Sequence, residues 1–487
     1  MNRIALTAAS LFAALFFKAA AEDVDYTDGF FIVNEDWYGH QNSTVNYFQP
    51  DNPDGDYWHY RVIQAENPGK ELGCTNQYGA IWDDRFYLIA KQDKDPGADV
   101  TGGRISVADA RTMKLIGQLQ LIDPSGKQCD GRAFTGVNSR KGYVSTSNGI
   151  WVLDLATLQI KGQVEGSSNP NMDASDDKPN SDPSSSLYYG QTGTMVLAEG
   201  KVFAVHQQYG VLVIDPQTDR VTEVLDMGIV DDAIEEETRS RPSKPAGIGS
   251  TIVRSLDGDL WYSVAKNVQG SGATLPYLVR LDPATLEREV IRIDGDDMYP
   301  PSNSWYAWTP DPFCASSVTN TLYWCGGPNS WFTNYRVFRY DIDTRRLEKI
   351  IDFSEEPGDW HIYGCSLGIH PETDELYASV FHKFVDPTYV LRRYDADGTL
   401  QMEYPMISNY WFPSLPVFPQ GAGHSGVENV TEERPEVSIR VENGMVVAGS
   451  GHTAEVYSLD GTRIPNRNLA KGVYIVKAGT AVRKIRI

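Results

Sequence analysis

The sequence is short of positive charge. Its 487 residues hold 43 Lys and Arg against 65 Asp and Glu, which gives a formal net charge of -22. Proteins that bind nucleic acid need Lys and Arg to neutralise phosphates. The charge balance therefore argues against a nucleic-acid partner, and it is typical of a soluble protein with an acidic surface.

Long hydrophobic runs are also lacking beyond the N-terminus. Residues 4–17 are apolar, Arg3 precedes them, and Ala19 to Ala21 offer a small-residue cleavage site before Glu22. This pattern predicts a secretory signal peptide over residues 1–21, too short and wrongly flanked for a membrane span. The first cysteine is Cys74, so the mature N-terminus would carry no thiol for lipid attachment.

Cysteine is scarce, and its five positions match no metal-binding spacing. Cys314 and Cys325 flank a predicted turn and could face each other across a hairpin, and Cys74 and Cys129 could also meet. An odd number leaves at least one thiol unpaired within the chain. There is no Cys-x-x-Cys, His-x-His or His-Glu-x-x-His, so we expect no zinc site. The sequence assigns no cofactor.

One short sequence pattern recurs along the chain. Residues 211–221 read VLVIDPQTDRV, a buried-looking strand that stops at Asp215-Pro216 with Thr218 three residues after the Asp. Five relatives follow the same order of apolar pair, Asp and usually Thr. The six aspartates are Asp109, Asp154, Asp215, Asp282, Asp341 and Asp395. Asp at the first position of a tight turn accepts backbone hydrogen bonds. We therefore interpret these residues as turn formers, not as catalytic acids.

Each turn is preceded by a Tyr-rich strand and a shorter apolar run, and it is followed by another strand. Four-stranded units repeated in this way predict the blades of a β-propeller. The N-terminal stretches 29–35, 43–49 and 58–64 supply three strands of a seventh blade. Residues 409–419 are the candidate for its missing first strand, which would close the ring. Because Pro413, Pro416 and Pro419 interrupt a ladder unless they lie at an open edge, a plain linker is the alternative. The predicted fold is all-β, a seven-bladed β-propeller over residues 22–419.

Two inserts and a tail interrupt this pattern. Residues 165–187 predict an exposed polar loop, and the charged residues 231–245 predict a loop with a helical turn. Residues 420–436 predict a linker, and residues 437–487 predict a small C-terminal β-sandwich domain. After Asp460 this tail has no acidic residue, and that reversal of charge marks a separate unit.

The tail resembles the C-terminal sorting domain of the type IX secretion (Por) system of Bacteroidetes. The resemblance rests on VYSLDGTRI (456–464), LAKGVYIVKAG (469–479) and KIRI (484–487). It implies that the type IX secretion machinery recognises this domain and carries the protein across the outer membrane.

The propeller resembles the YncE-like propellers of Bacteroidetes cell-surface proteins, in particular the DUF5074 family. The resemblance rests on GFFIVNEDWYGHQNSTVNYF (29–48), FYLIAKQ (86–92) and WFPSLPVFP (411–419). It implies a place beside a TonB-dependent outer-membrane transporter for some members and the capture of corrinoids for others. The family label itself implies no activity.

A binding site is predicted where the loops into each first strand meet the loops between second and third strands. These loops are rich in aromatic and polar residues, which suit a flat or sugar-like ligand. The candidates are Trp37, Tyr38, Tyr78, His206, Gln208, Trp305, Trp308, Trp331, Trp360, His361 and His382. The alternative is that these side chains pack between blades.

These observations favour a secreted or cell-surface, non-enzymatic protein that binds a small-molecule or glycan ligand, such as a nutrient or cofactor, with a corrinoid as one candidate. Two alternatives remain. One is a propeller polysaccharide lyase or hydrolase that uses a His, Tyr or Arg base on the same face, and the other is a scaffold for surface proteins.

Overall fold

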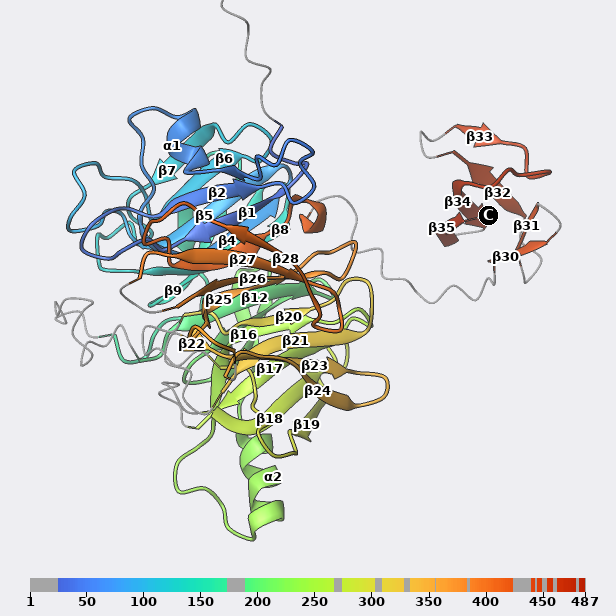
Figure 1. Cartoon of the computed structure of the whole chain (residues 1–487). Helices are drawn as coiled ribbons and strands as arrows, with labels where there is room; N and C mark the ends of the chain where they lie inside the picture. The colour runs from blue at the N-terminus through green and yellow to red at the C-terminus, as the bar shows by residue number, and fades with distance from the viewer. Residues whose placement is uncertain are drawn as a thin grey trace, which may run out of the picture. The chain divides into compact units, whose positions relative to one another are not determined.

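A computed structural model (Figure 1) describes most of the chain. The described residues are 25–172, 189–266, 274–302, 309–327, 333–354, 356–382, 386–423, 439–442, 445–448, 453–458, 462–478 and 481–486. The predicted signal peptide, residues 1–21, lies outside them. The chain divides into two compact units, Met1–Gly426 and Val427–Ile487.

The first unit is built from β-strands, and the predicted all-β fold is confirmed. Its described residues form seven antiparallel sheets, which we number as blades in chain order. Blade 1 has the order β29-β1-β2-β3, with β29 at Pro413–Val417, β1 at Phe30–Asn34, β2 at Thr44–Phe48 and β3 at Trp58–His59. Blade 2 contains β4 (Cys74–Trp82), β5 (Arg85–Gln92), β6 (Ile105–Asp109) and β7 (Leu115–Leu119).

The next three blades repeat the same order of four strands. Blade 3 contains β8 (Gly131–Asn138), β9 (Lys141–Thr146), β10 (Gly149–Asp154) and β11 (Gln159–Gln163). Blade 4 contains β12 (Thr192–Ala198), β13 (Lys201–His206), β14 (Gly210–Asp215) and β15 (Arg220–Leu225). Blade 5 contains β16 (Gly247–Arg254), β17 (Leu260–Ala265), β18 (Thr274–Leu281) and β19 (Arg288–Arg292).

The last two blades share one small strand. Blade 6 contains β20 (Phe313–Ala315), β21 (Thr321–Gly326), β23 (Arg336–Asp341) and β24 (Arg346–Asp352). Blade 7 contains β25 (His361–Ile369), β26 (Leu376–Phe381), β27 (Tyr389–Tyr394) and β28 (Leu400–Pro405). The loop between β21 and β23 adds β22 (Thr333–Asn334) to blade 7, beside β25. The sequence pattern did not predict this fifth strand.

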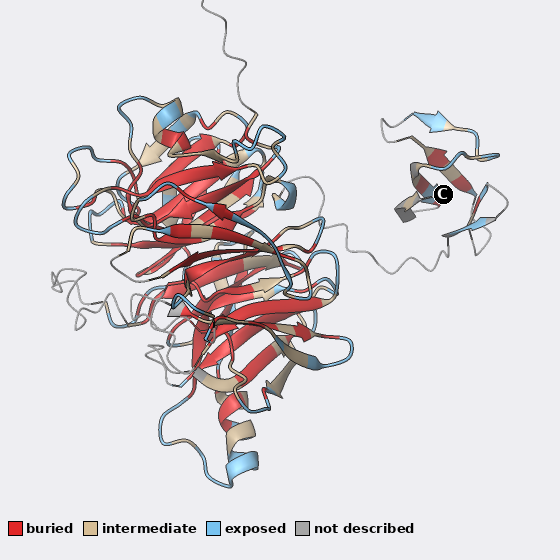
Figure 2. Cartoon of the chain, viewed as in Figure 1, coloured by how far each residue is buried: buried red, intermediate tan, exposed pale blue. Residues whose placement is uncertain are grey.

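The blades have a propeller-like arrangement. The first strand of each blade contacts the first strand of the next, in the order β4, β8, β12, β16, β20 and β25. Strand β29 contacts both β25 and β4. Figure 2 shows that burial is greatest in the middle strands of the blades, while outer strands and loops face solvent. Strand β2 is buried throughout, whereas the outer strand β15 is mostly exposed.

The two ends of the first unit meet in blade 1. Strand β29 pairs antiparallel with β1, so that Phe31 lies opposite Val417 and Ile32 opposite Pro416. This pairing confirms that residues 409–419 supply the missing first strand. Strand β29 is the edge strand of its sheet, so one of its sides faces no neighbouring strand of the sheet. Proline, which has no N–H group to donate, is tolerated in such a strand, as at Pro413 and Pro416.

The repeated aspartates close turns, as the sequence predicts. At Asp215, Oδ1 accepts a hydrogen bond from Gln217 N at 2.8 Å, and Oδ2 accepts one from Thr218 Oγ1 at 2.9 Å. These bonds stabilise the carboxylate and lower the pKa of Asp215. Equivalent backbone bonds occur at the other five positions, which are Asp109, Asp154, Asp282, Asp341 and Asp395.

Two sequence predictions need correction. The expected strand over residues 58–64 is only β3, because the chain turns at Arg61, which has a φ of 55°, into helix α1 (Val62–Glu66). The expected helical turn in the charged insert is a longer helix, α2 (Gly228–Thr238), and it begins before the insert. Val230 anchors α2 in the core. Most of the predicted loop 165–187 lies outside the described residues.

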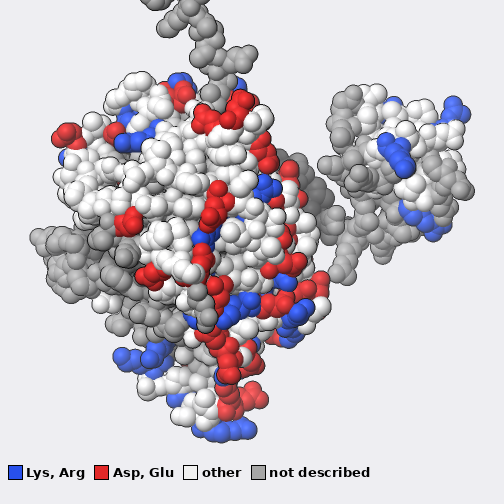
Figure 3. All heavy atoms as spheres, in the orientation of Figure 1, with Lys and Arg blue, Asp and Glu red and all other residues white. Residues whose placement is uncertain are grey.

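Aromatic rings pack between neighbouring blades. Tyr87 of blade 2 stacks on Phe134 of blade 3 at a centroid distance of 4.1 Å. Between blades 1 and 7, Phe30 meets Tyr377 at 4.7 Å and Phe48 meets Tyr404 at 4.7 Å. Figure 3 shows the surface, where Lys and Arg lie among more numerous Asp and Glu. Some of these charged side chains form ion pairs between blades, such as Lys141 of blade 3 with Asp219 of blade 4 at 2.8 Å.

The cysteines form no disulfide. All five are free, and Cys314 lies opposite Tyr323 in the β20–β21 pairing, so it does not face Cys325 as the sequence had allowed. Burial raises the pKa of Cys129 to about 12 and that of Cys314 to about 12. These thiols therefore stay protonated at neutral pH.

The second unit is a small β-structure. Strands β30 (Ile439–Glu442) and β31 (Met445–Ala448) form one sheet. The other sheet has the order β33-β32-β34-β35, with β32 at Ala454–Tyr457, β33 at Arg463–Ile464, β34 at Val473–Ala478 and β35 at Ala481–Arg486. Val446, Val456 and Val476 form its core. No described helix of the chain is long and apolar enough to cross a membrane.

We predict that Trp411→Ala destabilises the first unit by about 3–5 kcal/mol, because it removes a large buried ring. Trp411 is fully buried, stacks on Tyr60 at 5.4 Å and donates a hydrogen bond to Ile407 O at 3.0 Å. Chemical denaturation measures the effect. Ile407→Ala is the control, because Ile407 is exposed and its substitution should change stability by less than about 0.5 kcal/mol. Equal effects of the two substitutions would contradict this account of the closing segment.

Thiol titration tests the cysteine assignment. Ellman's reagent should react slowly with the native protein at pH 8, since the thiols are enclosed and protonated. All five thiols should react in guanidinium chloride without prior reduction. A lower count that rises after reduction would show that a disulfide exists.

Candidate functional site

A cluster of buried polar residues lies at one end of the ring, where first strands begin and second strands end. We call this end the axial face and the group the axial cluster. Antiparallel pairing brings these strand ends together, as where Cys74 lies opposite Gln92. The axial cluster comprises Glu35, Gln77, Lys91, Asp130, Arg132, Gln191, Thr309 and Tyr363, all of them buried.

Gln77 ties three blades together in this cluster. Its Nε2 donates hydrogen bonds to Glu35 Oε1 at 2.5 Å and to Thr309 Oγ1 at 3.1 Å. Thr309 leads into blade 6, which is not adjacent to blade 2, so the amide reaches across the ring axis. Tyr363 of blade 7 donates its hydroxyl to Glu35 Oε2 at 3.1 Å. These side chains fill the axial end of the ring.

The axial cluster also contains charged side chains of both signs. Arg132 donates from Nε and Nη2 to Gln191 Oε1 at 3.0 and 2.5 Å, and its guanidinium is 3.9 Å from the Asp130 carboxylate. Burial raises the pKa of Glu35, and the charge of Lys91 opposes that shift. Burial and the nearby Arg132 lower the pKa of Lys91. The cluster thus concentrates titratable groups in a low-dielectric site, as binding and catalytic sites do.

Some buried acceptors in this region are unused. Gln77 Oε1, Asn76 Oδ1 and Ser366 Oγ have no hydrogen-bond partner among the described residues. A buried polar atom without a partner costs free energy, so such atoms normally meet water or a ligand. The axial end can therefore accept hydrogen bonds from a donor that enters it.

The loop between β1 and β2 carries Trp37 and Tyr38 and is held by Asp36. Asp36 adopts a φ of 58° and accepts hydrogen bonds from Gln41 Nε2 at 2.5 Å and from Thr44 Oγ1 at 2.6 Å. Burial raises the pKa of Asp36 to about 8. Burial thus favours the protonated form of this carboxyl group, and its bonds to Gln41 and Thr44 fix an otherwise exposed loop.

Predicted aromatic residues form two groups on the axial face. Trp37 and Tyr38 are 39% and 50% exposed, and Trp37 packs against His40 at 4.0 Å and Tyr410 at 4.1 Å. Trp360 packs against His382 at 3.6 Å, with the Arg392 guanidinium 4.8 Å from its ring centre. Trp37 and Tyr38 are exposed and Trp360 is partly buried, and the accessible ring surface of each can offer a flat contact to a ligand.

The remaining predicted residues differ in their surroundings. His206 is fully buried, its Nδ1 accepts from Gln208 N at 3.2 Å, and burial lowers its pKa to about 4, so it serves the β13–β14 turn. Gln208 is exposed, Tyr78 is half-buried, and His361 packs against Tyr335 at 4.5 Å. Trp305, Trp308 and Trp331 lie outside the described residues.

Sequence reasoning missed the charged members of the cluster. Glu35, Lys91 and Asp130 were not among the predicted residues, although each lies at the end of a strand or just before one. The usable signal was a charged residue inside or directly after an apolar run, as in FFIVNE (30–35) and FYLIAK (86–91). Such residues are seldom buried without a partner.

One catalytic pattern occurs without its structural context. Residues 364–368 read GCSLG, the Gly-x-Ser-x-Gly form of a nucleophile elbow. They lie within β25, so Ser366 is a buried strand residue, not the tip of a strand-to-helix turn. The described residues also contain no group of three or more His, Cys, Asp or Glu side chains that could hold a metal ion.

Comparison with known proteins identifies the family. The model of DUF5074, a domain of unknown function, matches residues 28–419. The chain belongs to the DUF5074 family. This match covers the seven described blades of the DUF5074 protein and leaves out its second unit. No curated protein matches the sequence.

Two solved structures are similar to the DUF5074 protein. One is the extracellular domain of a putative one-component system from B. thetaiotaomicron, with a TM-score of 0.42 and 12% identity over 94% of this chain. The chain spans 57% of the length of that structure. The other is a protein of unknown function from Bacteroides caccae, with a TM-score of 0.34 and 11% identity, covering 64% of this chain and 93% of the other.

We predict that Asp36→Asn makes the stability of the DUF5074 protein less dependent on pH. The pKa of Asp36 is raised from 3.8 to about 8, so folding favours the protonated form and wild-type stability falls as the pH rises from about 4 to about 8. Asparagine is neutral throughout. The variant should match the wild type near pH 4 and exceed it by about 5 kcal/mol at pH 8, because the shift is about four pKa units and each unit corresponds to about 1.4 kcal/mol.

Denaturant unfolding at both pH values measures this difference. Asp54→Asn, in the exposed loop between β2 and β3, is the control and should not alter the pH profile. A variant that is less stable than the wild type at pH 8 would contradict the assignment of a protonated Asp36.

Proposed function

We propose that this DUF5074 protein is an exported, non-enzymatic binding protein that captures a small polar ligand, such as a nutrient or cofactor, on its axial face. The observation that carries the proposal is the axial cluster, in which six blades place charged, amide and hydroxyl side chains in one buried site. Ligand sites in proteins combine such converging polar groups with apolar walls.

Two aromatic residues on this face, the exposed Trp37 and the partly buried Trp360, support this proposal. Trp37 and Trp360 lie in the β1–β2 loop and in the segment before β25, so they come from adjacent blades on the axial face. They would provide the apolar contacts, while the axial cluster would provide hydrogen bonds. A ligand with both ring faces and polar groups fits this combination, and corrinoids and glycans are two such classes.

The surroundings of three candidate bases count against the rival lyase or hydrolase. A lyase base must be able to lose its proton near neutral pH. Burial and the neighbouring Glu35 raise the pKa of Tyr363 well above its usual value, so the phenol keeps its proton. His206 is enclosed in a turn, and the Nδ1 atom of His382 lies 2.6 Å from the Gly358 carbonyl oxygen.

The place of action is also part of the proposal. The predicted signal peptide and the resemblance of the tail to type IX sorting domains support export to the cell surface or beyond. A surface protein that captures a nutrient would pass it to an outer-membrane transporter, and a TonB-dependent transporter is the partner that the family resemblance implies. Sorting by the type IX machinery would require the second unit.

We predict that Trp37→Ala and Trp360→Ala each weaken ligand binding by about tenfold, because each removes a contact surface worth about 1.4 kcal/mol. The purified full chain is mixed with cyanocobalamin or neutral oligosaccharides, and retention is followed by gel filtration and tryptophan fluorescence. Trp58→Ala is the control, since Trp58 lies in the outer strand β3 and should leave binding unchanged.

Two results would count against the proposal. Binding that survives both axial substitutions would place the ligand elsewhere. New ultraviolet absorbance during incubation with uronic-acid glycans would show lyase turnover, and the protein would then be an enzyme.

A further inference from the structure

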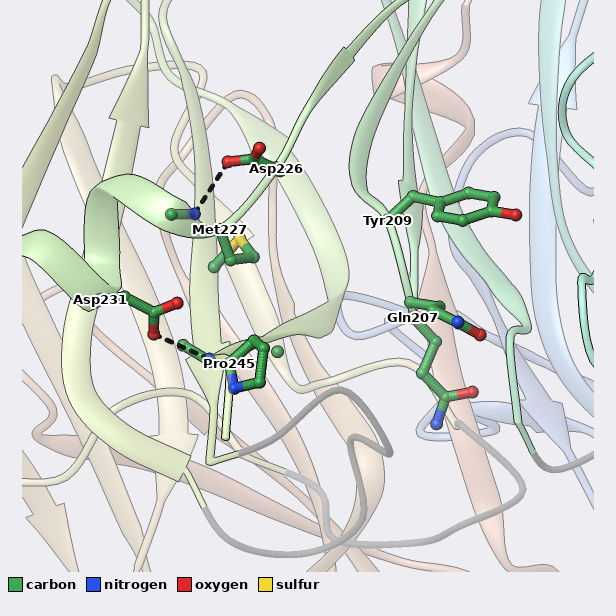
Figure 4. Close-up of a pocket in the computed structure, with 10 residues that line it drawn as sticks. Gln207, Tyr209, Asp226, Met227, Asp231 and Pro245 are labelled. Atoms are coloured by element: carbon green, nitrogen blue, oxygen red, sulfur yellow. Dashed lines mark hydrogen bonds between the residues drawn. The ribbon is translucent and has the colours of Figure 1, made fainter. Parts of the chain in front are cut away.

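An off-axis pocket lies beside the axial cluster, between blades 4 and 5. It has a volume of about 470 Å³. Three segments line it, which are the β13–β14 turn, the chain from the end of β15 into α2, and the residues that lead into β16. Figure 4 shows Asp226, Met227 and Asp231 on one side, with Gln207 and Tyr209 on the other.

The α2 side of the pocket is held in place. Asp226 Oδ1 accepts a hydrogen bond from Gly228 N at 2.9 Å, and Asp231 Oδ1 accepts one from Ala246 N at 2.9 Å. At the other end of the helix, Tyr277 donates its hydroxyl to Glu237 Oε2 at 2.6 Å. The carboxylates therefore have fixed positions before any ligand arrives, which reduces the entropy lost on binding.

The opposite side is fixed as well. Tyr209 stacks on the buried His206 ring at 4.3 Å, and Tyr209 N donates to His206 Nδ1 at 3.3 Å. Gln208 Oε1 accepts from Asn171 Nδ2 at 2.7 Å. The pocket thus combines an oriented aromatic ring with amide groups.

The lining selects against negative charge. The described residues that line the pocket include two carboxylates and no Lys or Arg. Its apolar surface comes from Met227, Pro245 and Ala246, beside the Tyr209 ring. A carboxylate accepts hydrogen bonds from hydroxyl groups, and apolar and aromatic surfaces suit C–H faces. An anionic ligand would meet repulsion at both Asp226 and Asp231.

We propose that this pocket binds one ring of a neutral sugar, whose hydroxyl groups donate to Asp226 and Asp231 and whose C–H face lies against Tyr209 and Met227. The inference rests on the proposed function, since it names the ligand class for the same face. Two hydrogen bonds connect the pocket to the axial cluster. Gln207 N donates to Gln191 O at 2.8 Å, and the Gln191 side chain accepts from Arg132 in the axial cluster.

Saturation-transfer NMR on the full chain tests the proposal with glucose, galactose, mannose, xylose and N-acetylglucosamine, and with glucuronate as the charged counterpart. At least one neutral sugar should give a signal, and glucuronate should bind at least tenfold more weakly. Asp231→Asn and Tyr209→Ala should each weaken the neutral sugar by about tenfold. Asparagine retains the acceptor for Ala246 N, so the pocket wall should survive.

Asp232→Asn is the matched control. Asp232 is the next residue on α2, is exposed and pairs with Arg241 at 2.6 Å, so its substitution should not change sugar binding. A circular-dichroism melt of each variant separates loss of folding from loss of binding. If Tyr209→Ala fails to fold, Asp231→Asn decides alone.

The outcomes separate this inference from the function proposed above. No signal from any neutral sugar, or equal binding of glucuronate, overturns the pocket assignment. Cyanocobalamin retained through Trp37 and Trp360 would leave the proposed function standing in that case. Sugar binding that is lost in Trp360→Ala but kept in Asp231→Asn also overturns the pocket assignment and retains the axial face.

Discussion

The pairing of β29 with β1 is the constraint on which the first unit depends. It joins segments from the two ends of the propeller within one sheet, and Ser414 Oγ donates hydrogen bonds to Val33 O at 3.0 Å and to Asn76 O at 2.8 Å. The same segment continues into the site, where Glu35 N bonds Phe412 O and Asp36 N bonds Trp411 O, at 2.9 and 3.0 Å. The segment that completes blade 1 therefore also shapes the axial face.

The polar and charged side chains at the centre of the axial face are buried. Isolated charges in a protein interior are costly, and they persist where amides, hydroxyls and opposite charges surround them. Here Gln77, Gln191 and Tyr363 provide those partners from three blades. The aromatic loops lie around this polar centre, and the pocket beside α2 adds the carboxylates of Asp226 and Asp231, with no Lys or Arg among its described lining residues. One face thus offers three chemically different surfaces.

Much of the fold follows from local sequence. The Asp turns, with their short loops and alternating apolar strands, fix the number and order of the strands in each blade, and the chain-end closure follows from counting them. The short β3 was missed because Trp58 to Gln64 has strand-like composition, while the left-handed Arg61 and the packing of Val62 and Ile63 produce a helix. Strand β22 was missed because two residues carry no periodic signal.

The site was less accessible to the same reasoning. Loop aromatics are visible in a sequence, and Trp37 and Trp360 do lie on the axial face. Burial of Glu35, Lys91 and Asp130 depends on contacts between blades that lie far apart in the chain, and no local pattern encodes such contacts. His206 shows the converse, since a conspicuous histidine in a loop position proves to be a buried turn residue.

The hydrogen bond from Ser414 to Val33 O joins residues that are 381 positions apart in the chain. Contacts of such large sequence separation form late, because the intervening chain must first be ordered. Blade 1 must remain a three-stranded sheet with an open edge until nearly the whole propeller has been synthesised. During that interval Glu35 and Asp36 lack the backbone partners that Phe412 and Trp411 supply in the complete fold.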